Sequence, residues 1–161
     1  MCKETSDIDE VFATASLGSP ENAVGFVLWR VFHRYQREVD RALEALGLTH
    51  LQFTTLTLVA WFGKNGEEAT QAKLSRFGDM HPMQLSLMLK ALEEKMLIER
   101  STSREDVRAK RSTITSSGLA VLRAALPVVV AVQRHLFGEA GLPGGTLLKM
   151  LSDIDRNPSV K

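Results

Sequence analysis

The chain has 161 residues, of which 44% are hydrophobic and 24% are charged, and these values exclude a disordered or collagen-like protein. Twenty basic residues nearly balance nineteen acidic ones, and the net charge of +1 excludes a protein that coats nucleic acid by charge alone. The single cysteine, Cys2, excludes an internal disulfide framework, and we expect it to be a bystander thiol.

The N-terminal part of the chain predicts an arm followed by a long helix. Residues 1–18 show no helical period, so we expect a flexible arm there. Ser19-Pro20-Glu21 is typical of a helix start, and apolar residues recur at helical spacing from Val24 to Leu46. One small core cannot cover so long a stripe, so part of it should face another chain.

The middle of the chain predicts a helix-turn-helix. Thr49 and Gln52 form a capping box for a second helix. Thr70 caps a short third helix, and His81-Pro82 opens a fourth, whose apolar stripe begins at Leu85 and runs through Met88 to Met96. Two short helices joined by a tight turn that contains glycine have the shape of a helix-turn-helix.

A β-hairpin is expected directly after the fourth helix. Two strands, at 97–103 and 109–115, flank a charged tip over 104–108, which makes the helix-turn-helix a winged one. Helical patterns return from Ser116 onward and again over 146–154. The expected fold is therefore mainly α with a small β-hairpin wing.

Charge is distributed unevenly along the chain. Residues 70–115 contain nine basic and six acidic residues, a net charge of +3, which leaves −2 for the rest because the total is +1. A cationic hairpin beside a recognition helix can lie along phosphates and reach the adjacent minor groove. The alternative interpretation is a solvated hairpin tip.

The stretch from Thr70 to Gly118 resembles the DNA-binding core of the MarR family, winged-helix regulators named for multiple antibiotic resistance. The matching residues are Gln71-Ala72-Lys73-Leu74-Ser75, Leu89-Lys90-Ala91-Leu92-Glu93-Glu94-Lys95 and Leu97-Ile98-Glu99-Arg100. The most specific piece is Asp106-Val107-Arg108-Ala109-Lys110 followed by Ile114-Thr115-Ser116-Ser117-Gly118, which is similar to the wing signature D-x-R-A-K and its following L-T-x-x-G. The order of six helices around one wing matches as well.

The resemblance implies a winged helix-turn-helix at about 49–115 within one domain over 19–161, with dimerisation helices at about 19–46 and 116–156. It implies that Arg108 enters the minor groove, held in orientation by Asp106, although the two residues alternatively stabilise the hairpin turn. On the fourth helix, Gln84 suits adenine, Lys90 suits guanine or phosphate, and Met83 or Leu87 suits a thymine methyl, unless these two pack on a neighbouring loop. The expected DNA-binding residues are Thr70, Gln71, Met83, Gln84, Ser86, Leu87, Lys90, Arg104, Asp106, Arg108 and Lys110.

Two positions depart from the family pattern. Leu87 stands where relatives usually carry a polar residue, often glutamine, and this leaves the base preference open. Met96 stands where relatives usually carry glycine, which predicts a different junction between helix and wing.

The resemblance also implies a homodimer and an effector. A two-fold dimer reads a pseudo-palindromic double-stranded operator with half-sites about one helical turn apart. The effector of such regulators is often an aromatic or phenolic acid, and the residues suited to it are Trp29, Arg30, His33, Arg34, Phe53 and Trp61. The alternative is that the tryptophans belong to the core and the arginines to a solvated face.

We therefore expect a homodimeric DNA-binding transcriptional regulator, a repressor released by a small ligand. Alternatives are a winged-helix protein-interaction module and a ligand-independent architectural DNA binder. The chain shows no nucleophile motif or phosphate loop and no paired histidines for zinc, so no enzyme, cofactor or metal site is expected. No apolar run approaches the length of a membrane span and no signal peptide is apparent, so a cytoplasmic location is expected.

Overall fold

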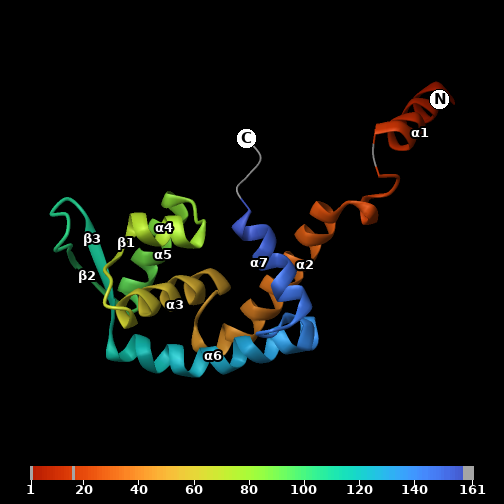
Figure 1. Cartoon of the computed structure of the whole chain (residues 1–161). Coiled ribbons are helices and arrows are strands. Elements are labelled where there is room, and N and C mark those ends of the chain that lie inside the picture. Colours follow the sequence, from red (N-terminus) through yellow and green to blue (C-terminus); the bar gives the residue numbers. More distant parts are fainter. Residues whose placement is uncertain (1, 16, 158–161) are drawn as a thin grey trace. The chain divides into compact units, whose positions relative to one another are not determined.

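Figure 1 shows the computed structural model of the chain, which describes residues 2–15 and 17–157. The chain divides into two compact units, Met1–Glu38 and Val39–Lys161, and each is described by itself. The boundary between the two units falls inside a helix, and the expected division into an arm over 1–18 and one domain over 19–161 stays a prediction.

The first unit is helical, including a segment for which we expected no regular structure. Helix α1 (Cys2–Ala15) is followed by a 3₁₀ turn, η1 (Pro20–Asn22), and by α2 (Val24–Leu43), which crosses into the second unit. In α1, Ile8, Val11 and Phe12 have the spacing i, i+3, i+4 and are all exposed. Our prediction of a flexible arm over residues 1–18 overlooked this short helical period. The side chain of Cys2 lies outside the part of the chain that is described.

The second unit contains the winged helix-turn-helix, and the expected fold class is confirmed. Two predicted N-caps are present: Thr49 and Gln52 form the reciprocal capping box of α3, and the Thr70 hydroxyl accepts a hydrogen bond from the Lys73 amide at 3.4 Å. The helix start predicted at Ser19 is wrong, because Ser19 precedes only the 3₁₀ turn η1, makes no side-chain cap hydrogen bond, and α2 begins at Val24. The elements are η2 (Glu44–Leu46), α3 (His50–Lys64), β1 (Ala69–Thr70), α4 (Gln71–Gly78), α5 (Pro82–Glu94), β2 (Ile98–Thr102), β3 (Lys110–Ile114), α6 (Ser116–Phe137), η3 (Gly138–Gly141) and α7 (Thr146–Arg156).

The sheet has three antiparallel strands in the order β1-β3-β2. The wing strands β2 and β3 pair from Ile98↔Ile114 to Thr102↔Lys110, inside the predicted ranges. Strand β1 pairs with β3 at Ala69↔Ser112 and Thr70↔Arg111, and the sequence did not predict it because two residues show no period. The pairing joins Thr70, the cap of α4, directly to the wing.

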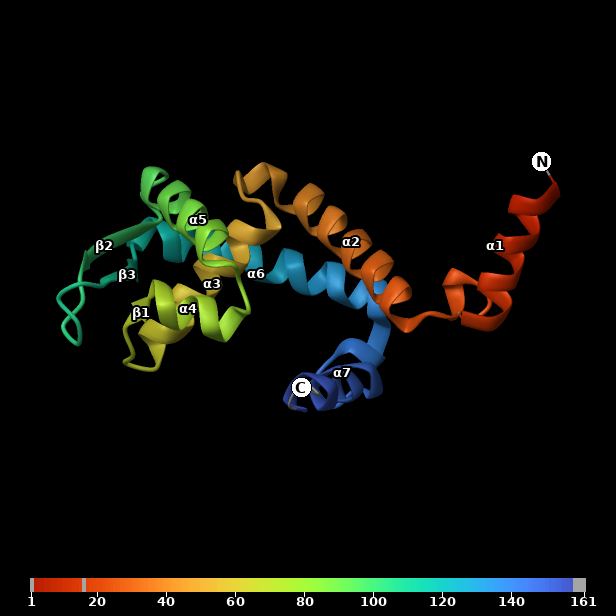
Figure 2. The same cartoon turned by 90° about the horizontal axis from the view of Figure 1, so that it is seen from above.

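The core of the second unit lies where α3, α4, α5 and the sheet meet (Figure 2). Leu85, Leu89 and Leu92 of α5 are fully buried, together with Leu56 of α3 and Leu74 of α4. Each buried leucine contributes about 1.5–3 kcal/mol relative to an exposed one. This packing determines which face of α5 is turned outward.

The junction between α5 and the wing is a type of helix ending that usually has glycine at its left-handed position. In this chain Met96 occupies that position. Met96 has a φ of 57° in the left-handed region. Its amide bonds to the Glu93 carbonyl and the Leu97 amide bonds to the Leu92 carbonyl, both at 2.9 Å, which is a Schellman motif. We expected a different junction here because methionine replaces glycine, and for the backbone this prediction is wrong. Met96 is 74% exposed and does not extend the buried stripe.

Helix α6 starts against this junction, at a glycine. Thr115 caps α6 by accepting from the Gly118 amide at 2.9 Å, and the Thr115 amide donates to the Leu97 carbonyl at 3.1 Å. A Cβ added at Gly118 would lie 2.0 Å from that same carbonyl oxygen. The glycine of the L-T-x-x-G-like motif is thus required by the close approach of two backbones.

By length and apolar composition alone, the segment Ser116–Gly141 would suffice to cross a membrane, although our sequence analysis found no such segment. Its apolar residues divide between two environments: Leu122, Ala125 and Val129 are buried in the core, whereas Leu119, Leu126 and Val130 are exposed. The core helix of a protein that spans no membrane has this composition too, so we interpret α6 as a core helix with a second, exposed apolar face.

Gly118→Ala should destabilise the second unit, because the new Cβ forces the Leu97 backbone to move. We expect a loss of about 1–3 kcal/mol in the free energy of unfolding, the usual cost of overpacking, measured by urea denaturation. Gly63→Ala is the matched control, because a Cβ there meets nothing within 4 Å, and it should stabilise α3 by about 0.5–1 kcal/mol. Equal stability of the two variants would contradict the close approach.

Candidate nucleic-acid interface

The outward face of α5 carries the residues that the sequence predicted to read bases. Met83 and Leu87 are 73% and 63% exposed, and Gln84 and Lys90 are exposed as well, whereas Ser86 is half-buried. Leu87 therefore does not pack on a neighbouring loop, which was the alternative for this residue. Lys90 lies 3.8 Å from Glu94 one turn further along the helix.

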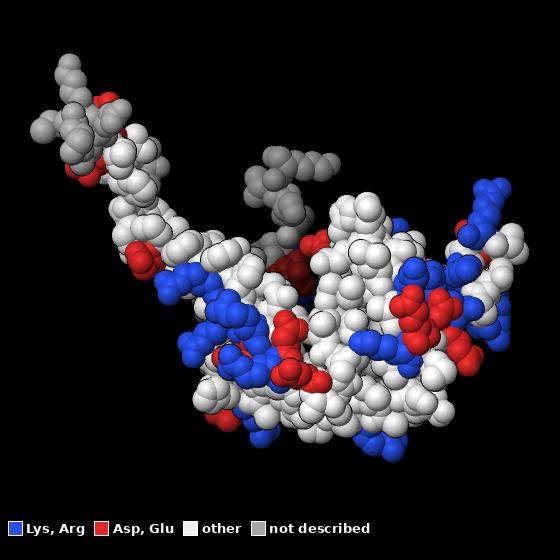
Figure 3. Space-filling model, turned by 180° about the vertical axis from the view of Figure 1, so that it is seen from behind, with Lys and Arg blue, Asp and Glu red and all other residues white. Residues whose placement is uncertain are grey.

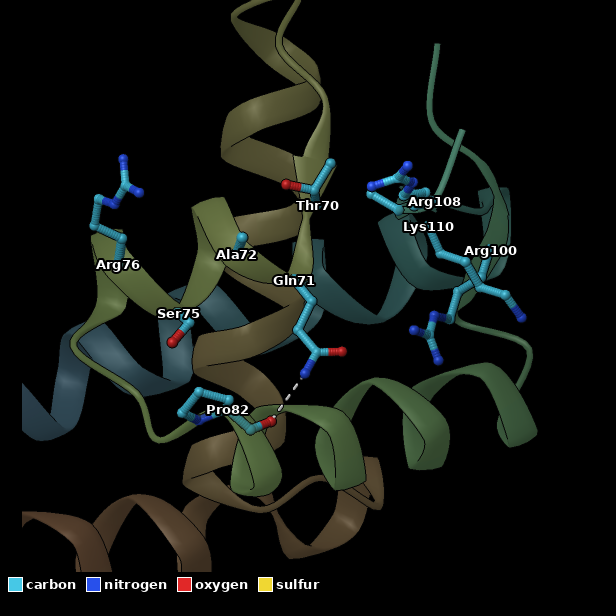
Figure 4. Close-up of a pocket in the computed structure, with 10 residues that line it drawn as sticks. Thr70, Gln71, Ala72, Ser75, Arg76, Pro82, Arg100, Arg108 and Lys110 are labelled. Carbon is cyan, nitrogen blue, oxygen red and sulfur yellow. Dashed lines mark hydrogen bonds between the residues drawn. The ribbon is translucent and has the colours of Figure 1, made fainter. Parts of the chain in front are cut away.

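The start of α4 is tied to the start of α5. Thr70 is buried and its hydroxyl caps α4, whereas the half-buried Gln71 donates from Nε2 to the Pro82 carbonyl at 3.0 Å (Figure 4). The hydrogen bond joins the first residue of α4 to the first residue of α5. Gln71 thus has a structural contact whether or not it also reaches DNA.

The wing places four predicted residues on its surface. Arg104, Asp106, Arg108 and Lys110 are all exposed. The Asp106 carboxylate accepts from the backbone amide of Arg108 at 2.9 Å, and the Asp106 carbonyl accepts from the Ala109 amide at 2.9 Å. Asp106 therefore orders the turn through the backbone, which leaves the Arg108 guanidinium directed by the turn and not by an ion pair with Asp106.

Glu68 anchors the wing loop, and the sequence analysis missed it. Its carboxylate accepts from the Ser103 hydroxyl and from the Arg104 amide (2.9 Å to Oε1), and it lies 3.6 Å from the Arg111 guanidinium. Ser103 Oγ in turn accepts from the amides of Glu105 and Asp106 at 3.1 and 3.2 Å. No local spacing signals this contact, because 35 residues separate Glu68 from Ser103.

These contacts shift the pKa values of two wing-associated groups. The Ser103 hydrogen bond, followed by the Arg104 amide, holds the pKa of Glu68 below its ordinary value. The pKa of Lys73 on α4 is raised by its hydrogen bond to Glu105, which lies 2.9 Å away on the wing loop. Through these contacts Glu68 and Glu105 connect the wing loop to the elements beside it.

A concave pocket of ≈ 690 Å³ lies between α4, the start of α5 and the wing (Figure 4). Arg100, Arg108 and Lys110 come from the wing side, and Figure 4 shows Gln71 on the facing side, at the start of α4. The Nε atom of Arg100 is buried and has no hydrogen-bond partner within the described residues. An unpaired buried donor is costly.

Basic side chains also gather on the molecular surface. Figure 3 shows lysine and arginine side chains at the wing with a few carboxylates among them, and a separate basic group along α2. Of the nine basic residues within 70–115, four line the pocket: Arg76, Arg100, Arg108 and Lys110.

The residues predicted for an effector divide between the two units. Trp29, Arg30, His33 and Arg34 lie on α2 and line a groove of ≈ 370 Å³ together with Arg37, which the sequence analysis did not name. The Trp29 and His33 rings are 4.3 Å apart, and His33 donates from Nδ1 to the Trp29 carbonyl at 2.7 Å.

The other two predicted effector residues are on α3, in the second unit. Phe53 is buried in the core and only 8% exposed, whereas Trp61 is 48% exposed. The ammonium group of Lys64 lies 5.0 Å from the Trp61 ring centroid. The tryptophans are therefore not core residues, contrary to one interpretation of the sequence.

Known proteins share this sequence pattern and this fold. The model of the MarR family matches residues 48–110. An uncharacterised HTH-type transcriptional regulator of Bacillus subtilis (strain 168), YdcH, is 35% identical over 126 residues, which cover 78% of this chain and 86% of that protein.

Two solved structures are similar over most of their length. CouR from Rhodococcus jostii RHA1 bound to p-coumaroyl-CoA has a TM-score of 0.73 at 23% identity, covering 89% of this chain and 98% of that one. The MepR–DNA complex of S. aureus has a TM-score of 0.70 at 22% identity, covering 83% of this chain and 95% of that one. With its winged helix-turn-helix and these relatives, the chain belongs to the MarR family of transcriptional regulators.

Proposed function

We propose that this protein is a homodimeric repressor that binds a pseudo-palindromic DNA operator through α5 and the wing. The observation that carries the proposal is the cationic pocket between α4, α5 and the wing, which contains Arg100, Arg108 and Lys110. It is continuous with the outward face of α5, because Pro82, the first residue of that helix, also lines it.

A DNA backbone suits this pocket. Phosphate oxygens are hydrogen-bond acceptors with negative charge, and the pocket offers the guanidinium and ammonium donors of Arg100, Arg108 and Lys110. A strand seated there places α5 in the major groove and the tip of the wing at the next minor groove. Thr70 and Ser75 also line the pocket, but the Ser75 hydroxyl already donates to the Met80 carbonyl at 2.6 Å and the buried Thr70 hydroxyl caps α4.

Exposed apolar surface supports a homodimer. In the first unit, α2 exposes Val24, Val27, Leu28 and Val31, and in the second unit α7 exposes Leu148, Met150, Leu151 and Ile154. The outer face of α6 adds Leu119, Leu126 and Val130. Apolar surface of this extent on a single chain marks an interface, and a two-fold partner would match the two half-sites of an operator.

The groove on α2 suits an anionic aromatic effector. Trp29 and His33 provide aromatic faces, and Arg30, Arg34 and Arg37 provide cations for a carboxylate or phosphate group. Binding there would favour a dimer geometry that no longer fits successive major grooves, and so release the operator.

A second candidate function is a winged-helix module that binds another protein. The exposure of Met83 and Leu87 on α5 favours it. Salt distinguishes the two functions, because DNA affinity falls steeply as salt displaces phosphate contacts, whereas an apolar protein contact is nearly insensitive to salt.

Arg108→Ala should weaken operator binding by about tenfold or more and reduce the slope of log affinity against log salt by about one per lost phosphate contact. Fluorescence anisotropy with a duplex selected from a randomised library would measure both, and the mass of the dimer should not change. Arg123→Ala, at an exposed position of α6, removes the same charge away from the wing and should bind almost as wild type. Unchanged affinity of the Arg108 variant would refute the wing assignment.

Glu68→Gln should loosen the wing and lower DNA affinity, even though it removes a negative charge close to DNA. Glu67→Gln is the matched control, since Glu67 is exposed and adjacent, and the loss of its charge alone should leave affinity equal or higher. Affinities that change alike in the two variants would mean that Glu68 does not position the wing.

The same anchor should be sensitive to acid. Because the pKa of Glu68 is lowered in the folded chain, its contribution is present above the ordinary value of 4.5 and is lost as pH falls through the lower, folded value. The protection factor of the Arg104 amide against hydrogen exchange should fall across this window in the wild type. It should be low and flat with pH in Glu68→Gln.

Anionic aromatic compounds should quench Trp29 fluorescence and release DNA. The probes are 4-hydroxycinnamate and its coenzyme A thioester, used in a Trp61→Phe background so that only Trp29 reports. Replacing Arg30 and Arg34 by alanine should weaken binding about tenfold or more, because hydrogen bonds to charged groups contribute about 1.5–3 kcal/mol each. Quenching that does not depend on these arginines would contradict the assignment of the groove.

A further inference from the structure

We infer that Met83 and Leu87 make operator recognition depend on thymine methyl groups in the major groove. The inference rests on the proposed function, because it concerns the same face of α5, and it names the chemical group that this face selects. It is carried by two large apolar side chains, 73% and 63% exposed, on a helix that also exposes the polar Gln84 and Lys90.

The two residues lie on the face of α5 opposite its core face. Leu85, Leu89 and Leu92 have no exposed surface and form a stripe at i, i+4 and i+7. Met83, Leu87 and Lys90 form a second stripe with the same spacing, displaced by two residues. Two residues correspond to about 200° around an α-helix, so the second stripe faces directly away from the core.

The surroundings of this stripe favour DNA as its occupant. Met83 follows Pro82, which lines the cationic pocket, so the apolar pair is continuous with the surface that suits phosphates. Gln84 and Lys90, both exposed on the same helix, suit base edges and phosphates. Among the groups that base pairs present in the major groove, the thymine C5-methyl is the apolar one. An apolar protein surface would leave the adjacent cations without acceptors.

The spacing of the two side chains defines a pattern of bases. Four residues of helix rise about 6 Å, and one base-pair step rises about 3.4 Å. Met83 and Leu87 therefore match methyl groups about two base pairs apart. Gln84, between them in sequence, suits an adenine in the same segment. Each half-site should contain two thymines, on either strand, around an A·T pair.

The experiment removes single methyl groups from DNA. Duplexes are selected from a library with a randomised centre, and thymines in the shared half-site are then replaced one at a time by deoxyuridine, which lacks only the C5-methyl. Burial of one methyl group should raise affinity about fourfold. Replacing the same thymine in both half-sites removes two methyl groups and should therefore weaken binding about fifteenfold. Thymines outside the half-sites are the matched control and should tolerate deoxyuridine.

Protein variants show which side chain contacts which methyl. The Leu87→Ala variant should bind two duplexes with equal affinity when they differ only in having thymine or deoxyuridine at one half-site position. The Leu87→Met variant should retain the preference for thymine at that position. Leu87 is exposed, so both variants should melt at the wild-type temperature. Met83→Ala provides the same comparison at the second position if Leu87→Ala fails to fold.

The outcomes separate this inference from the proposed function. If no duplex is enriched, both are overturned and a protein partner becomes the better explanation of the apolar pair. If a duplex is enriched but binds equally with deoxyuridine in the half-sites, only the role of the methyl groups is overturned. Methyl dependence that persists in both alanine variants would likewise overturn the assignment to Met83 and Leu87.

Discussion

The burial of Leu85, Leu89 and Leu92 beneath α5 is the interaction on which the rest of the interface depends. A helix can turn about its own axis, and a displacement of one residue would turn it by about 100°. Such a turn would expose buried leucines, each worth about 1.5–3 kcal/mol. The core therefore sets the rotation of α5, and with it the outward direction of Met83 and Leu87. The base specificity that we propose for α5 is in this sense a consequence of packing on its opposite face.

The wing needs a different kind of support, because an isolated two-stranded hairpin is marginally stable in water. Three contacts from distant segments hold it: β1 pairs with β3, Glu68 accepts hydrogen bonds from the loop, and α6 begins against the Leu97 carbonyl at Gly118. All three lie at the base or the side of the hairpin. They leave the Arg108 guanidinium free of intramolecular ion pairs within the described residues while its backbone is ordered, which reduces the entropy lost on binding.

What the sequence predicted correctly was encoded locally. The caps at Thr49 and Thr70 and the stripe that begins at Leu85 involve residues within a turn or two of one another, so spacing alone reveals them. Glu68 and Ser103 are 35 residues apart, and strand β1 has two residues, so neither has a local signal. At Met96 the prediction failed for another reason: the backbone requirement of the helix ending outweighs the modest cost of a left-handed methionine.

The carboxylates within the basic lobe explain why net charge is a poor guide to this molecule. Glu68 and Glu105 reduce the positive charge of the wing region, yet each holds part of the wing loop, through Ser103 and through Lys73 respectively. These carboxylates order the wing loop but weaken the long-range attraction between the wing region and a polyanion. Affinity should then follow the few cations that the ordered loop and pocket present to phosphates, since each phosphate contact releases its own counterion. A chain with a net charge of +1 can in this way bind a polyanion tightly, because the position of its cations relative to the phosphates matters more than their number.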